Sequence, residues 1–213
     1  MHPSAREAHP TPHPSEFALP PGALWVFGYG SLMWDPGFPY VQCARARVYG
    51  FHRALCVYST RWRGTADRPG LVLGLAPGGA CRGVAYQVAA DDVDTVLAGL
   101  WAREMRRRAY EPRLFRARVG SREIHALGFI ANVAHPAYAG ELTIQERAFL
   151  VATCCGDRGT NVDYLKRTIN HLSELGVRDP ELLAILEAAI DTRHAQAGDG
   201  NERAPAAARK PKG

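Results

Sequence analysis

The sequence lacks the patterns that mark a disulfide-rich, zinc-binding or membrane-spanning protein. Its cysteines number five, and no two of them are spaced as C-x-x-C, which argues against both a disulfide framework and a structural zinc site. No apolar run approaches the roughly 18 residues of a membrane span. The N-terminal segment contains no apolar core of a secretory signal. We therefore expect a cytoplasmic protein with reduced thiols that binds neither a metal nor a membrane.

The sequence also lacks the glycine motifs of nucleotide-binding and serine-hydrolase folds, although the segment WVFGYGSLMW contains two glycines and a serine. Gly28 and Gly30 are followed by Met33 where a dinucleotide loop needs a third glycine. Tyr29 and Met33 stand where a nucleophile elbow around Ser31 needs glycines. No phosphate-binding G-x-x-x-x-G-K-[ST] run occurs. Two interpretations remain: a tight turn after a core strand, or a loop whose backbone N–H groups receive an anion.

What the chain does have is the composition of an ordinary globular domain. Of its 213 residues, 46% are hydrophobic and 22% are charged, and the net charge is +5. This modest basic balance suits a small acidic substrate. Three consecutive arginines at 106–108 have no aromatic platform beside them, so no nucleic-acid partner is expected. Composition predicts a disordered tail at 1–22, one folded domain at 23–194 and a disordered basic tail at 195–213.

Short apolar segments separated by turn residues indicate a small, closed or strongly curved sheet. Strands are expected at residues 24–28, 44–50, 53–59, 71–76, 82–88, 113–119 and 123–131, with Pro-Gly-Gly-Ala at 77–80 as a turn. Helices are expected after Asp91-Asp92, from the capping box of Thr143 and Glu146 to about 156, from about 161 to 175, and after Asp179-Pro180. This order predicts an α+β fold and favours a small closed or strongly curved sheet over a doubly wound one.

Glu104 is placed on the apolar face of one of these helices. Eleven residues separate it from Val93, which returns it to within roughly 20° of the same face. A carboxylate there faces the interior or a pocket, and burial raises its pKa, which makes it a better proton acceptor near neutral pH. The alternative is a structural glutamate paired with an arginine. The apolar stripe consists of Val93, Val96, Leu97, Leu100 and Trp101.

Five segments carry a family resemblance through their order and spacing. They are VFGYGSLMW (26–34), RGTADRPGLVLGLAPGGACRGVAYQV (63–88), LWAREM (100–105), ANVAHPAYAG (131–140) and GTNVDYLKRTINHLSELGVRDPEL (159–182). Together they resemble the ChaC-like γ-glutamylcyclotransferases, in particular the bacterial branch. The resemblance covers about residues 25–186, which is most of the expected folded domain.

This resemblance implies a small mixed or antiparallel β-barrel flanked by helices, and a lyase reaction that needs no cofactor and consumes no water. Glutathione is converted to 5-oxoproline and cysteinylglycine when the α-amine of the γ-glutamyl group attacks its own γ-carbonyl. The implied base is Glu104. Eukaryotic relatives often have Gly-Gly-Tyr soon after this glutamate, whereas here MRRRAY leads to Tyr110. The implied substrate-binding residues are Tyr29, Gly30, Ser31, Leu32, Met33 and Trp34, of which the last two are expected to wall the pocket.

Further candidates come from loop positions. Tyr138 is a candidate hydrogen-bond donor to the substrate, and Arg63 and Arg68, which flank a turn, are candidates for a glycyl carboxylate. Other γ-glutamyl amino acids or amines are alternative substrates, and a non-enzymatic regulator of cation transport is an alternative function. The sequence defines no oligomeric state.

Overall fold

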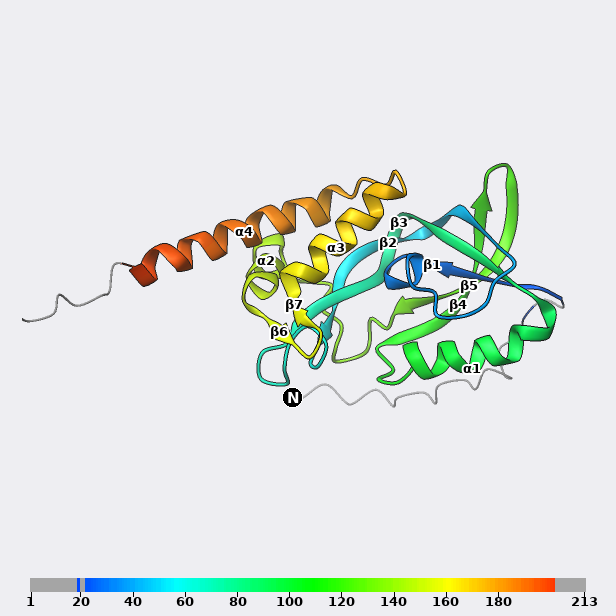
Figure 1. Ribbon diagram of the computed structural model, residues 1–213, viewed down its shortest axis with the longest axis horizontal. Coiled ribbons are helices and arrows are strands. Elements are labelled where there is room, and N and C mark those ends of the chain that lie inside the picture. Colours follow the sequence, from blue (N-terminus) through cyan, green and yellow to red (C-terminus); the bar gives the residue numbers. More distant parts are fainter. Residues whose placement is uncertain (1–18, 20–21, 202–213) are drawn as a thin grey trace, which may run out of the picture.

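The centre of the structure is a closed barrel of five strands in the order β1-β3-β2-β4-β5 (Figure 1). The computed structural model describes residue 19 and residues 22–201. β1 pairs with β5 in parallel, and the other neighbouring strands pair antiparallel. The predicted α+β fold with a mixed barrel is confirmed. The barrel strands are β1 Leu24–Gly28, β2 Gln42–Ser59, β3 Gly70–Val88, β4 Tyr110–Val119 and β5 Arg122–Ala131, and a two-stranded sheet contains β6 Cys155–Gly156 and β7 Gly159–Thr160.

β2 and β3 form one long antiparallel hairpin, which corrects the prediction of four short strands. The Pro-Gly-Gly-Ala sequence is not a turn but lies within β3. Its glycines Gly78 (φ 96°) and Gly79 (φ 70°) lie opposite Gly50 (φ 83°), at an irregularity in the pairing register. Glycines with positive φ are typical of both turns and bulges, so only the pairing with the neighbouring strand distinguishes the two. The actual connection between the strands is residues 60–69.

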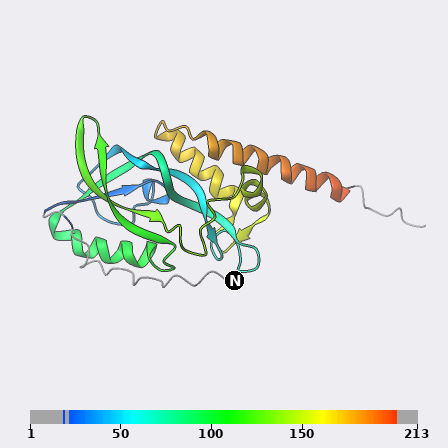
Figure 2. The ribbon, with the colours of Figure 1, turned by 180° about the vertical axis from the view of Figure 1, so that it is seen from behind.

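The helices lie in two groups on different sides of the barrel, as both views show (Figure 1 and Figure 2). α1 packs its apolar stripe against β1, with Val96, Leu97 and Leu100 buried in the same cluster as Leu24 and Val26. The group of α2, α3 and α4 packs on the other side. The helices are η2 Ser31–Met33, η3 Ala90–Asp92, α1 Val93–Glu104, α2 Ile144–Thr153, α3 Asn161–Glu174 and α4 Pro180–Asn201.

The helix ends follow the predicted signals, with two differences. The capping box is present: Thr143 accepts the Glu146 N–H at 3.3 Å and donates its own N–H to the Glu146 carboxylate at 2.7 Å. α2 ends earlier than predicted because residues 155–156 pair with β7. α4 runs to Asn201, past the expected domain boundary at 194. The rest of both predicted tails lies almost entirely outside the described residues. Among the helices described, none is long and apolar enough to cross a membrane.

Candidate functional site

A cavity of about 640 Å³ opens where the loop after β1, the end of β2, the end of α1 and the side of α3 meet. Its volume lies in the range of about 300–1,000 Å³ that is usual for small-molecule sites. Segments that are far apart in the sequence therefore line a single cavity. The structure brings together most of the predicted site residues here, namely Tyr29, Gly30, Ser31, Leu32, Trp34 and Glu104.

The loop after β1 is tightly folded because Gly28 permits a close approach. A Cβ at Gly28 would lie 2.9 Å from the Cβ of Leu32, so a side chain does not fit there. The Gly30 carbonyl accepts the Met33 N–H at 2.8 Å, and the Ser31 carbonyl accepts the Asp35 N–H at 2.8 Å. The N–H groups of Ser31 and Leu32 stand at the N-terminal end of this turn, where amides have no acceptor within the helix. Both residues line the cavity.

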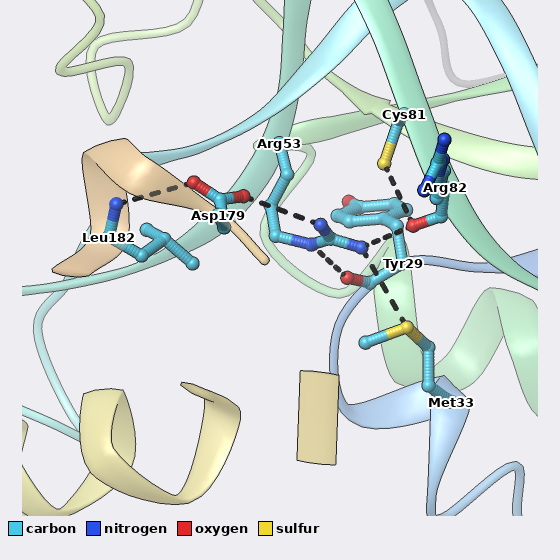
Figure 3. Close-up of polar contacts among 7 residues, drawn as sticks. All are labelled: Tyr29, Met33, Arg53, Cys81, Arg82, Asp179 and Leu182. Atoms are coloured by element: carbon cyan, nitrogen blue, oxygen red, sulfur yellow. Dashed lines mark hydrogen bonds and ion pairs between the residues drawn. The ribbon is translucent and has the colours of Figure 1, made fainter. Parts of the chain in front are cut away.

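A buried arginine holds this loop in place through its hydrogen bonds (Figure 3). Arg53 is 5% exposed. It donates from Nε to the Tyr29 carbonyl at 2.6 Å and from Nη2 to the Arg82 carbonyl at 2.6 Å. Its Nη1 lies 3.4 Å from Oδ2 of Asp179, whose Oδ1 accepts the Leu182 N–H at 3.3 Å. The guanidinium thus connects the loop to β3 and to the first turn of α4.

Met33 does not line the cavity, which differs from the expectation that it walls the substrate pocket. Its side chain is buried with its sulfur 3.7 Å from Nη2 of Arg53 (Figure 3), and its carbonyl accepts the Tyr86 hydroxyl at 2.6 Å. Trp34 does line the cavity and stacks on His171 of α3, with ring centroids 4.4 Å apart. The two neighbouring side chains at the end of η2 therefore lie on different sides of the loop, and only Trp34 faces the cavity.

Tyr138 is also placed outside this cavity. Its backbone pairs with Val57 of β2, and its ring packs against a separate apolar cluster around Cys56 and Ala76. The sequence indicated only that Tyr138 lies in a loop, and a loop position does not determine which face of the barrel it covers. Of the two candidate arginines, Arg63 lines the cavity and the exposed Arg68 does not.

Glu104 is the final residue of α1, and its side chain is 18% exposed at the cavity. Burial raises the pKa of its carboxyl group, and the neighbouring Arg103, whose Nε lies 3.2 Å away, lowers it by less. Arg103 also donates to the Ser31 hydroxyl at 2.9 Å and to the Asp35 carbonyl at 3.0 Å. This arginine therefore holds the end of the helix against the glycine loop.

Three phenols lie close enough to Glu104 for its charge to act on them. Burial raises the pKa of Tyr29, Tyr110 and Tyr164, and the charge of Glu104 raises each of them further. The Tyr110 hydroxyl donates to the Leu73 carbonyl at 2.8 Å, and the Tyr164 hydroxyl accepts the Leu73 N–H at 3.2 Å. The sequence analysis missed Tyr164, because it lies on α3 and no local pattern relates it to Glu104.

The charge of the cavity lining is predominantly positive. Seven arginines line it, against the two carboxylates of Asp35 and Glu104. Such a lining attracts an anionic ligand. No group of three or more metal-ligating side chains occurs within residues 22–201 or at residue 19.

Residues 24–192 match the protein family described as ChaC-like protein. This chain belongs to the ChaC-like family. A relative from Escherichia coli K12, named glutathione-specific gamma-glutamylcyclotransferase, is 37% identical over 166 residues, which are 78% of this chain and 72% of the relative. The human glutathione-specific gamma-glutamylcyclotransferase 1 is 33% identical to this ChaC-like chain over 175 residues, 79% of each chain.

The fold of this ChaC-like chain agrees with that of a solved relative. The crystal structure of a yeast gamma-glutamyl cyclotransferase specific to glutathione superposes with a TM-score of 0.74. The match covers 82% of this chain and 98% of the yeast chain, at 23% sequence identity. The barrel and its flanking helices are therefore the architecture of the family.

Proposed function

We infer that this protein is a γ-glutamylcyclotransferase that converts glutathione to 5-oxoproline and cysteinylglycine. Membership in the ChaC-like family and the names of its bacterial and human relatives support this inference. The observation that carries it within the molecule is Glu104: a carboxylate with a raised pKa that lines a cavity beside a glycine loop. A protein that acts only as a regulator has no need of this arrangement.

The reaction requires a proton acceptor more than any other catalytic group. The α-amine of a γ-glutamyl compound is mainly an ammonium ion at neutral pH and cannot attack until it loses a proton. Glu104 takes this proton, and the free amine attacks the γ-carbonyl to form the five-membered lactam. The α-nitrogen gives up a second proton as the lactam forms and the C–N bond to the leaving amine breaks. Both protons lost by the α-nitrogen, one of them carried by Glu104, end on the departing nitrogen as an ammonium group. General acid–base catalysis of this kind contributes typically about 10²–10⁴-fold.

The role of the glycine loop is to bind negative charge on the substrate. Attack on the carbonyl produces an oxyanion, and the α-carboxylate of the glutamyl group carries a charge throughout. The amides of Ser31 and Leu32, at the start of η2, are suited to either oxygen. The positive lining of the cavity fits a substrate with two carboxylates, such as glutathione.

Product analysis tests the reaction directly. Purified protein incubated with glutathione is expected to release equal amounts of 5-oxoproline and cysteinylglycine. Glutathione acetylated on its α-amine is expected to be inert, because an amide nitrogen does not act as the nucleophile. Release of glutamate, or of N-acetylglutamate from the acetylated substrate, would identify a hydrolase and contradict the inference.

Glu104→Gln tests the assignment of the base. The glutamine keeps the shape but cannot accept the ammonium proton, so turnover is expected to fall by at least about 10²-fold. Glu111→Gln is the matched control, since Glu111 is an exposed strand residue outside the cavity. A Glu104→Gln variant with the turnover of the control would exclude Glu104 as the base.

A further inference from the structure

We propose that Arg63 binds the carboxylate at the C-terminal end of the leaving peptide, so that the cavity selects γ-glutamyl peptides over γ-glutamylamines. This proposal rests on the proposed function and concerns the part of the substrate that departs. Arg63 would recognise the leaving peptide rather than the glutamyl group that reacts.

The Arg63 side chain is fixed in place but retains a free binding edge. Its Nη1 donates to the carbonyls of Arg158 and Thr160, at 2.5 Å and 3.5 Å, and the guanidinium lies over the Tyr164 ring, 5.0 Å from its centroid. Its Nε and Nη2 have no acceptor within the described part of the chain. These two groups form the edge of a guanidinium that binds a carboxylate through two parallel hydrogen bonds.

Within the described residues, the positive charge of Arg63 is not paired with a carboxylate. Its neighbour Arg61 is paired with Asp157 at 3.0 Å, whereas no carboxylate among the described residues lies within ion-pair distance of Arg63. The nearby Asp163 accepts the Thr160 hydroxyl at 2.7 Å instead. Burial lowers the pKa of Arg63, since its charge is partly removed from water. A ligand carboxylate would supply the missing counter-charge.

Other cations reinforce this wall of the cavity. Arg158 and Arg167 line it together with Arg63, and neither has an acidic partner in the part of the chain that the structure describes. Arg61 and Arg158 both lie over Trp62, at 4.5 Å and 4.3 Å from its ring centroid. Arg103 also lines the cavity, but it already pairs with Glu104 and donates to Ser31.

The leaving peptide would extend from Glu104 toward Arg63. Tyr164 is close to both, since Arg63 lies over its ring and Glu104 raises its pKa. When the glutamyl amine is at Glu104, a leaving dipeptide extends its carboxylate about 7 Å beyond the scissile nitrogen, at roughly 3.5 Å per residue. A γ-glutamylamine has no carboxylate to place there, and a γ-glutamyl amino acid places its carboxylate one residue nearer to the reacting bond.

The test compares glutathione with its glycine amide, which differs only in lacking the terminal charge. For the wild type, kcat/KM is expected to be higher for glutathione by about tenfold or more, mainly through KM. In Arg63→Gln the ratio of the two kcat/KM values is expected to fall to about one. Arg68→Gln, an exposed arginine in the same connection, is the matched control and is expected to keep the wild-type ratio.

Two further measurements keep the outcomes distinct. Arg63→Lys retains the charge but not the paired donors, so an intermediate ratio is expected, and this variant also serves if the glutamine variant does not fold. Binding of glutathione and of its glycine amide to Glu104→Gln, measured by calorimetry, tests Arg63 without turnover.

Failure of the wild type to form 5-oxoproline would overturn the proposed function. Equal binding of acid and amide, an equal loss for both substrates in Arg63→Gln, or a wild-type ratio in Arg63→Lys would overturn the role of Arg63.

Discussion

Glu104 combines two properties that a general base needs, a position at the cavity and a raised pKa. Its position follows from the end of α1, where the helix stops at Glu104 and the side chain emerges beside the glycine loop. Its pKa is raised by burial, and the adjacent Arg103 reduces but does not cancel this effect. A base whose pKa approaches the working pH transfers a proton in both directions more readily.

The pH dependence of the reaction is expected to report this pKa. Below the pKa of Glu104 the carboxyl is protonated and cannot accept the ammonium proton, so the rate falls on the acid side. The midpoint of this fall is expected above the usual value of 4.5, as measured by kcat/KM for glutathione between pH 4 and 8. A midpoint at or below 4.5 would contradict the effect of burial.

The pH dependence of thermal stability is a second test of the burial of Glu104. Because folding raises the pKa of Glu104, the ionised side chain disfavours the folded state above that pKa, and this cost disappears below the unfolded value. Glu104→Gln is therefore expected to have a higher Tm than the wild type at pH 8. The difference is expected to vanish as the pH falls below about 4.3.

Arg53 is expected to be essential for the position of the glycine loop. Arg53→Met removes the donors to the Tyr29 and Arg82 carbonyls and leaves the carboxylate of Asp179 without its cation. The free energy of unfolding is expected to fall by about 3 kcal/mol, and kcat for glutathione is expected to fall as the loop loses its support.

The control for Arg53→Met is an exposed arginine. Arg116→Gln removes a surface ion pair with Glu123, in which both side chains are more than 60% exposed, and is expected to change stability by less than about 1 kcal/mol. Urea denaturation measures both variants. Similar losses in the two would show that the buried network around Arg53 does not determine stability.

At the scale of elements, a buried asparagine links α3 to β3. Asn161 is fully buried at the start of α3 and forms two hydrogen bonds with the backbone of Leu71, accepting its N–H at 2.6 Å and donating to its carbonyl at 2.7 Å. A Cβ at Gly70 would lie 2.6 Å from the same amide oxygen. The amide therefore takes the place of a neighbouring strand at this point of β3.

Asn161→Ala is expected to destabilise the protein by about 3 kcal/mol, because it leaves two buried backbone groups of Leu71 without partners. Thr143→Ala, which removes only the exposed cap of α2, is expected to cost about 1 kcal/mol. Thermal unfolding of both variants measures which of the two loses more stability. A larger loss for Thr143→Ala would contradict the role given to Asn161.

At the scale of the whole molecule, the cavity exists because barrel and helices close on each other. Its walls come from the loop after β1, β2, β3, the end of α1 and α3, which are distant in the sequence. α4 packs beside α2 and then projects away from the barrel (Figure 1).

Removal of residues 1–18 and 202–213 is expected to leave kcat/KM unchanged and Tm within about 2 °C of the wild type. The composition of these ends, rich in proline, alanine and charge, offers too few apolar positions to stabilise a packed structure. A truncation that also removes α4 is the control, since it deletes the fully buried Leu182 and Ile185 and is expected to unfold the protein. A large loss in the shorter truncation would show that an end docks on the core.

Local patterns in the sequence were sufficient for the elements that fold by local rules. The stripe that begins at Val93 predicted the buried face of α1, and the capping box of Thr143 predicted the start of α2. The same helical periodicity placed Glu104 toward the interior, where the structure has it. The family resemblance supplied the barrel, which periodicity alone left between a closed and a curved sheet.

The tertiary structure decided what depends on pairing between distant residues. Gly78 and Gly79 carry the same signal in a turn and in a bulge, and only their register with β2 makes them a bulge. Met33 turns toward Arg53, and Arg63 reaches the cavity beside Tyr164 of α3. A sequence records which face of its own element a residue occupies, because that is set by local backbone geometry. It does not record which other element lies opposite, because that contact forms only when the whole chain packs.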